Sequence, residues 1–390
     1  MAVATLVLLL MANYMTFTTA RTVFSTFEGR QEVAHITQPG TFIQNLDPNS
    51  EFDLDKITEQ SLQRVYDYLA RNHSYALYTD GYIVELPNSV HVEVPISYMN
   101  KAYNDLNGFD VADGKGLSFD YDLGENKPIS VLVGSGLAKD YPIGTNFTIK
   151  DPALGRELSF VVTGVLSKDA SHSNFYALDS KQYYNFSVVV PVNEAFIRQA
   201  KIAFKLNGVM DIIVTNTDRA SVNELGENVF RNTHAKFNYF SQEENSAEYY
   251  SQFRSSLIFL VIMTLVLLSI IIVASVWSAL VNARLMIREF TLNLLVGLGY
   301  SKLSRICYTY YALIAGSSLV FIGGLAAYSR YGFWQRRDVY FMTYGVGGLI
   351  QMDWLAMVVS LIMNIVVVAL VSGILTSRLK RVPISVGVLQ

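Results

Sequence analysis

Four long runs of apolar residues divide this chain, at 2–20, 255–281, 306–328 and 354–376. Each approaches or exceeds the roughly 20 residues that a helix needs to cross a bilayer. The first run could also be a cleaved signal peptide. Nothing basic precedes it, however, and it is longer than the apolar core of about 7–15 residues typical of such peptides. The pattern therefore favours four transmembrane helices, one before and three after a large polar region.

Residues 21–254, between the first two runs, have the mixed pattern of a folded domain. Apolar residues at helical spacing predict helices over 54–71 and 218–232. Short apolar or alternating segments bounded by turn residues such as Asp80-Gly81 predict strands. These strands are expected at 75–86, 89–96, 129–133, 145–150, 158–166, 186–190 and 209–214, with a loop-rich stretch at 107–126. The expected fold class is an α-helical membrane protein with four transmembrane helices (1+3) and a large α+β extracytoplasmic domain between helices 1 and 2.

Basic residues near the ends of the runs indicate the orientation, because cytoplasmic ends carry an excess of Lys and Arg. The connection 282–305 and the tail 377–390 carry Arg284, Arg288, Lys302, Arg305, Arg378, Lys380 and Arg381. The opposite ends carry Arg21, Arg254, Arg330, Arg336 and Arg337. The modest bias places 282–305 and 377–390 in the cytoplasm of a bacterial cell, and places the domain 21–254 and the loop 329–353 outside.

Composition narrows the function classes. Only 16% of residues are charged, against about 25% in soluble domains, which agrees with the predicted spans. A formal net charge of -3, without a basic-aromatic patch, disfavours a nucleic-acid partner. Cys307 is the single cysteine, so an intramolecular disulfide is excluded.

Candidate catalytic and binding motifs fail on spacing. The glycines of 108–116 do not match a phosphate loop, and Gly116 stands where a magnesium-binding Ser or Thr is needed. Gly134-Ser135-Gly136 does not match a nucleophile elbow. The acidic residues and histidines match no metal motif; they are Asp110, Asp113, Asp120, Asp122, His35, His73, His91, His172 and His234. We expect no catalysis, no cofactor and no metal in this chain.

Two glutamates at the outer ends of predicted spans, Glu28 and Glu248, are candidate ligand contacts, although interfacial charges are the commoner interpretation. The predicted spans themselves contain no charged residue, which disfavours an ion-conducting path. Small residues recur four positions apart, as where helices pack closely within one chain or between two. These pairs are Ala274 with Ser278, Ser275 with Ala279, and Ala312 with Gly316.

Two segments resemble a known family. The sequences VLVGSGLA at 131–138, IGT at 143–145 and FVVTGVL at 160–166 resemble the strand and turn series of the outer domain of MacB-like permeases. The sequence RLMIREFTLNLLVGLGYSK at 284–302 resembles the FtsX-type permease signature that follows the second span. Val296 departs from that signature, and this sequence contains no fused nucleotide-binding domain. The resemblance therefore implies an ABC permease that works by mechanotransmission with a separate ATP-binding subunit, which would bind ATP and Mg.

The resemblance also implies a second permease chain, most simply a homodimer in the bilayer, and allows an extracytoplasmic adaptor. The segment 282–305 would contact the ATPase: apolar side chains would dock in a groove, charged ones would line its rim, and Gly297 and Gly299 would end the helix. Ser301 would cap the next helix. The expected coupling residues are Arg284, Arg288, Glu289, Phe290, Leu292, Leu295, Gly297, Gly299, Tyr300 and Ser301.

Three functions remain open at this point. The first is efflux of, or resistance to, a peptide, toxin or other outer-side substrate. The second is an FtsX-like regulator of a cell-wall hydrolase, which the large outer domain disfavours. The third is a membrane-anchored interaction module or receptor that has no ATPase.

Overall fold

The computed structural model describes residues 2–33, 38–50, 57–124, 127–174, 177–285, 287–297 and 299–381. These residues form two compact units. The helical unit comprises Met1–Thr26, Phe253–Arg330 and Val346–Gln390, and the outer unit comprises Phe27–Gln252 and Tyr331–Gly345. Each unit is built from segments that lie far apart in the sequence.

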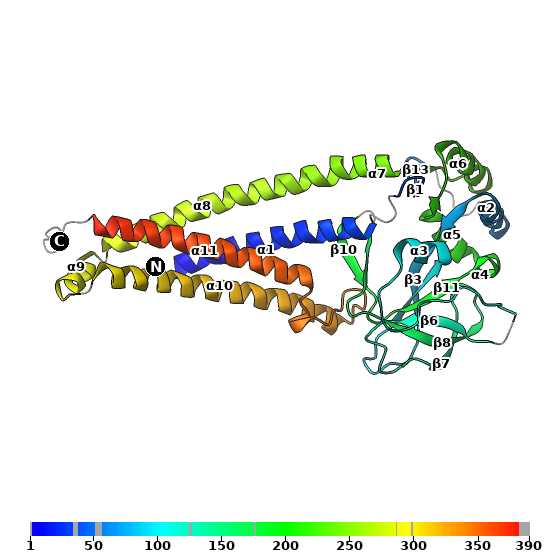
Figure 1. Cartoon of the computed structure of the whole chain (residues 1–390), viewed down its shortest axis with the longest axis horizontal. Helices are drawn as coiled ribbons and strands as arrows, with labels where there is room; N and C mark the ends of the chain where they lie inside the picture. The colour runs from blue at the N-terminus through cyan, green and yellow to red at the C-terminus, as the bar shows by residue number, and fades with distance from the viewer. Residues whose placement is uncertain are drawn as a thin grey trace. The chain divides into compact units, whose positions relative to one another are not determined.

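Four long apolar helices make up most of the helical unit: α1 (Ala2–Val33), α8 (Ser255–Leu285), α10 (Tyr300–Arg336) and α11 (Gln351–Lys380) (Figure 1). In the part of the chain that is described, all four are long and apolar enough to cross a membrane. They contain 32, 31, 37 and 30 residues. At 1.5 Å per residue each is about 45 Å or more long, against about 30 Å of hydrocarbon. The helices therefore continue beyond the apolar runs that predicted them.

The four helices do not share the packing equally. One apolar cluster joins Leu9 of α1, Ala279 of α8, Tyr311 of α10 and Val371 of α11. A second cluster takes its described members from α1, α10, α11 and Leu349, and none from α8. The buried residues of α8 begin only at Thr264, and its first turns are exposed. Helix α8 therefore packs over part of its length, where it lies closely against α11 and contacts α1.

The outer unit contains a seven-stranded mixed sheet in the order β3-β4-β11-β6-β8-β5, with β7 paired to β8. Its strands are β3 (Tyr78–Val84), β4 (Val94–Asn100), β5 (Val111–Gly114), β6 (Ile129–Val133), β7 (Asn146–Lys150), β8 (Glu157–Leu166) and β11 (Val188–Val192). Both faces of the central strands are buried. In β6, Val131 and Val133 belong to one core cluster and Leu132 to another, as the two-residue period of a strand requires.

A four-stranded sheet in the order β13-β1-β12-β2 completes the core of the outer unit. Its strands are β1 (Phe42–Leu46), β2 (Ser74–Ala76), β12 (Ile213–Thr215) and β13 (Phe237–Ser241). The accompanying helices are α2 (Glu59–Asn72), α3 (Lys101–Asn107), α4 (Glu194–Gln199), α5 (Ile202–Met210) and α6 (Arg219–Thr233). A hairpin of β9 (Ser171–Asn174) and β10 (Ala177–Tyr183) stands apart from both sheets. Helix α7 (Gln242–Tyr249) and a π-helical turn at Tyr250–Arg254 precede α8.

The structure corrects several sequence predictions. Asp80-Gly81 is not a turn: it lies inside β3, where the register to β4 shifts and Gly81 has a φ of 83°, which marks a β-bulge. Residues 209–210 end helix α5 and do not begin a strand. The stretch 107–126, predicted as loop-rich, contains the edge strand β5. Residues 54–56 of the predicted helix 54–71 lie outside the described residues.

Residues 331–345, which lie within the extracytoplasmic loop predicted at 329–353, belong to the outer unit. Val339 and Met342 are buried in the main core of that unit, and Trp334 packs against the same core. The backbone N–H of Tyr183 donates to the carbonyl of Tyr340 over 2.8 Å. A segment separated from the rest of the outer unit by residues 253–330 thus completes its core.

Candidate functional site

The predicted coupling segment is a short helix held between two long ones. Helix α8 ends at Leu285, helix α9 spans Ile287–Leu295, and helix α10 begins at Tyr300. Gly297 has a φ of 100°, a left-handed conformation that costs a residue with a Cβ about 1–2 kcal/mol. Gly297 therefore ends α9 as predicted.

Gly299 and Ser301 act differently from the prediction. Gly299 is not among the described glycines of positive φ. Its carbonyl accepts hydrogen bonds from the N–H groups of Lys302 and Leu303, so Gly299 occupies the capping position of α10. Ser301 lies within the first turn of α10 and is not its N-cap.

The described side chains of α9 divide into two faces. Thr291 is buried, and Phe290 packs against the cluster that contains Leu303 and Cys307. Glu289 and Leu292 are exposed, and so is Val296 directly after the helix, at 88%. One face thus lies on the helical unit, and the other presents a carboxylate and apolar groups.

The remaining predicted coupling residues surround this helix. Arg284, Gly299 and Ser301 are exposed, and Tyr300 is half-buried. The side chains of Arg288 and Leu295 lie outside the described ones. The prediction that the whole set contacts another protein stays a prediction.

Of the two glutamates proposed as ligand contacts, Glu28 already has a partner. Its carboxylate lies 2.9 Å from Nζ of Lys181, whose side chain is buried. Both residues belong to the outer unit. The side chain of Glu248, on α7, lies outside the described ones. The ion pair supports a structural role for Glu28.

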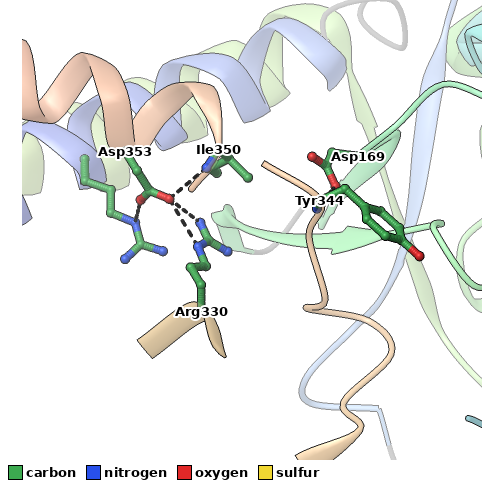
Figure 2. A network of polar contacts seen from close by, with 6 residues as sticks. Asp169, Arg330, Tyr344, Ile350 and Asp353 are labelled. Carbon is green, nitrogen blue, oxygen red and sulfur yellow. Dashed lines mark hydrogen bonds and ion pairs between the residues drawn. The ribbon is translucent and has the colours of Figure 1, made fainter. Parts of the chain in front are cut away.

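The helical unit contains a buried ion cluster that the sequence predictions missed. Arg330 donates through Nε and Nη2 to Oδ2 of Asp353, over 3.1 Å and 3.0 Å (Figure 2). The N–H of Ile350 donates to the same oxygen over 3.1 Å, and Nε of Arg21 lies 3.0 Å from Oδ1. Arg330 is 5% and Asp353 0% exposed. This cluster joins α1, α10 and the first turn of α11.

A second buried polar group joins the same three helices. Asn13 on α1 donates through Nδ2 to Oγ of Ser318 on α10 over 2.7 Å and to Oδ1 of Asn364 on α11 over 3.1 Å. Asn364 donates back to Oδ1 of Asn13 over 2.9 Å. All three side chains are buried. Within an apolar bundle, such mutually satisfied amides favour one packing of the helices.

The positions of these residues in the sequence could have indicated both the ion cluster and the Asn13–Asn364 group. Asn13 and Asn364 interrupt apolar runs, and Arg330 and Asp353 lie just beyond the predicted ends of their spans. What the sequence could not show is that these residues face one another. Of the small-residue pairs, Ser275 and Ala279 are buried inside the unit, whereas Ala312 and Gly316 are exposed.

In the outer unit, the connection 331–345 is fixed by Asp169 and Asn185. Oδ1 of Asp169 accepts from the N–H of Tyr344 over 2.9 Å, which Figure 2 shows, and from Nδ2 of Asn185 over 2.7 Å. Asn185 also donates to the carbonyl of Met342 over 3.0 Å. Burial, followed by the nearby Asp169 charge, raises the pKa of Tyr344 to about 12, so its hydroxyl stays neutral.

The Gly134-Ser135-Gly136 turn, which carried part of the family resemblance, packs against the same residues. A Cβ on Gly134 would lie 1.8 Å from the carbonyl oxygen of Tyr184. A Cβ on Gly136 would lie 2.6 Å from the Tyr344 hydroxyl. Ser135 donates to Oδ1 of Asn185 over 2.8 Å. The glycines are therefore needed for close approach, and this explains the motif without a catalytic role.

A known protein family matches the N-terminal part of this chain. The family model of the MacB-like periplasmic core domain matches residues 1–229. No curated protein matches the chain. Among solved structures, the extracellular domain of the noncanonic ABC-type transporter YknZ from Gram-positive bacteria is 15% identical, with 52% of this chain and 100% of that chain covered and a TM-score of 0.32. The periplasmic region of MacB from Actinobacillus actinomycetemcomitans is 14% identical, with 55% and 94% covered and a TM-score of 0.32.

Proposed function

This chain belongs to the MacB-like ABC transporter permeases, and from that premise we propose that it converts ATP hydrolysis by a separate subunit into movement of its outer unit. ATP and Mg would be bound by that subunit, and two permease chains would pair. The observation that carries the proposal is the segment from α9 to Gly297. It presents a carboxylate and exposed apolar side chains beside a turn of fixed geometry.

The orientation follows the distribution of basic residues. The ends of α8, α10 and α11 next to α9 carry Arg284, Lys302 and Lys380, which favours the cytoplasm for this side. The outer unit and the connection 331–345 then lie outside the cell membrane. An ATPase in the cytoplasm would meet α9 without crossing the bilayer.

We propose that the helical unit has a movable part, α8, and a stiffer part formed by α1, α10 and α11. Two buried polar groups hold α1, α10 and α11 together. In the described residues α8 is bonded to α1 through a single side-chain hydrogen bond, between Thr19 and Thr264 over 2.8 Å. Helix α8 also directly precedes α9 in the chain. We therefore propose that α8 moves relative to the other three helices.

The substrate is proposed at the outer side. The amide side chains of Asn13 and Asn364 are buried inside the bundle, where they are hydrogen-bonded to each other. A bundle filled in this way favours work on the outer unit over a path through the helices. We propose export of, or resistance to, a peptide or toxin, with an extracytoplasmic adaptor as a further partner. The test compares strains with and without the gene on a panel of peptides and haem; unchanged sensitivity would favour a regulator of a cell-wall enzyme.

The coupling proposal is tested by purifying the chain from its native membranes and measuring the ATPase that copurifies with it. We expect Leu292→Glu and Arg288→Glu to lower recovery of the ATPase by roughly tenfold, which corresponds to the loss of about 1.4 kcal/mol of binding free energy. The matched control is Lys380→Glu, a charge reversal on an exposed residue of α11 outside the segment. Normal recovery of an active ATPase with both α9 variants would disprove the proposed contact.

Absence of any ATPase from the purified wild-type chain has a separate meaning. It would favour a membrane-anchored interaction module over a permease driven by ATP. The wild-type sample distinguishes the two cases: an ATPase that binds the wild type makes the α9 variants informative, whereas an ATPase missing from the wild type argues against the proposed function itself.

A further inference from the structure

The ion cluster of the helical unit has more positive than negative charge. Arg21, Arg330 and Asp353 contribute two guanidinium groups and one carboxylate. The sequence of this unit contains one other acidic residue, Glu289, which lies on α9 at the opposite end of α8 and α10. Among the described residues of the helical unit, one positive charge of the cluster therefore has no carboxylate to balance it.

Arg21 is the member of the cluster that is open to a further ligand. Its contact with Asp353 is made by Nε, and Oδ1 of Asp353 receives no hydrogen bond from the described residues, so this contact is an ion pair of poor hydrogen-bond geometry. Among the described residues, Nη1 and Nη2 of Arg21 donate no hydrogen bond, and the side chain is 40% exposed. Arg330, by contrast, is 6% exposed in its side chain and donates twice to Asp353.

The depth of the cluster is marked by aromatic residues. Tyr328 precedes Arg330 by two positions, and Trp354 follows Asp353 directly. Both rings are exposed, at 70% and 45%. Exposed Tyr and Trp at the ends of spanning helices are typical of the level of the lipid headgroups. At that level the most abundant anion is the phosphate of the lipids.

We propose that the terminal guanidinium edge of Arg21 binds the phosphate of a phospholipid headgroup, with Asp353 and Arg330 orienting it. Two parallel N–H groups match two phosphate oxygens, and a lysine cannot reproduce this bidentate geometry. The phosphate would neutralise the excess charge of the cluster. In the orientation proposed above, the phosphate would also attach α1 to the outer leaflet, at the level where the ion cluster joins α1 to α10 and α11.

The test measures lipid retained by the full chain, purified in detergent, by native mass spectrometry. We expect the wild type to keep one more phospholipid per chain than Arg21→Gln, with occupancy at least roughly fivefold lower in the variant, as expected for loss of one charge-assisted hydrogen-bonded pair. Arg21→Lys keeps a cation beside Asp353 but loses the fork. It should melt at the same temperature as the wild type and still lose the lipid.

Arg336→Gln is the matched control, because Arg336 is an exposed arginine outside the cluster, and it should retain lipid as the wild type does. Equal lipid retention by the wild type, Arg21→Gln and Arg21→Lys would overturn the proposal. Glycerophosphate is the probe for a soluble source of phosphate. If glycerophosphate displaces the lipid at equal concentration, the site recognises free phosphates and the lipid assignment is wrong.

Discussion

At the scale of single residues, Gly134 shows why the outer unit needs a glycine where two backbone segments approach closely. Gly134 faces two carbonyl oxygens, of Tyr184 and Asn185, at distances that a Cβ cannot share. Its N–H donates to the carbonyl of Ser187 over 2.8 Å. The turn after β6 is thereby pressed against the chain that enters β11. A side chain here would push apart two buried strands.

Gly134→Ala should therefore destabilise the outer unit by about 3 kcal/mol or more, because overpacking a site with rigid backbone neighbours cannot be relieved by side-chain rotation. The change is followed as a drop in the unfolding temperature of the full chain and as faster proteolysis. Gly116→Ala is the control, since no atom lies within 4 Å of a Cβ placed there. Similar melting of the two variants would refute the close-packing explanation.

At the scale of elements, the helices α1, α10 and α11 differ from α8 in the kind of side-chain contacts that join them. Buried amides and ion pairs bridge the first three, whereas the described part of α8 is held by apolar contacts and one hydroxyl pair. Polar contacts in an apolar surrounding are directional, so they fix helix register more strictly than aliphatic packing does. Helix α8 is also the most apolar of the four.

Asn13→Ala and Asn364→Ala should each lower the stability of the helical unit by about 1 kcal/mol, and the double variant should lose less than the sum, because each single change removes a hydrogen-bond partner of the other buried amide. The measurement is a double-mutant cycle from reversible unfolding in detergent micelles. Thr18→Ala should have little effect, since its hydroxyl bonds only to the backbone of its own helix. Strict additivity of the two asparagine variants would contradict the shared network.

At the scale of the whole molecule, chain order and spatial units do not coincide. Along the chain, the outer unit is formed by 27–252, which leads from α1 to α8, and by 331–345, which leads from α10 to α11. The second stretch is held in the core of that unit by Asp169 and Asn185. The outer unit is thus tied covalently to all four long helices. Movement of any helix has a covalent route to it.

If α8 moves during the ATPase cycle, a disulfide between Thr19→Cys and Thr264→Cys should stop ATP-dependent activity, and a reductant should restore it. The two hydroxyls lie 2.8 Å apart on α1 and α8. The measurement is ATPase activity of the assembled complex before and after oxidation, in a Cys307→Ala background.

The matched pair is Ser304→Cys with Thr376→Cys, whose hydroxyls lie 3.4 Å apart on α10 and α11. This disulfide should leave activity intact because both helices belong to the stiff part of the unit. Full activity with the α1–α8 disulfide closed would show that α8 does not move against α1.

Most of the coarse organisation could be predicted from the sequence. Long apolar runs require helices in lipid, since a span must satisfy its own backbone groups, and alternating segments produced β6, β7 and β8 close to the predicted limits. Signals carried by neighbouring residues therefore determined the spans, several strands and the α9 break at Gly297.

The tertiary structure decided what depends on residues distant in the chain. The pairing of Asn13 with Asn364, the burial of Arg330 against Asp353, and the docking of 331–345 under Asp169 each join positions that no local period relates. The bulge at Gly81 and the cap at Gly299 likewise follow from how the neighbouring strand or helix is placed. Hydropathy measures the average environment of a segment, whereas these contacts depend on which side chains face one another after packing.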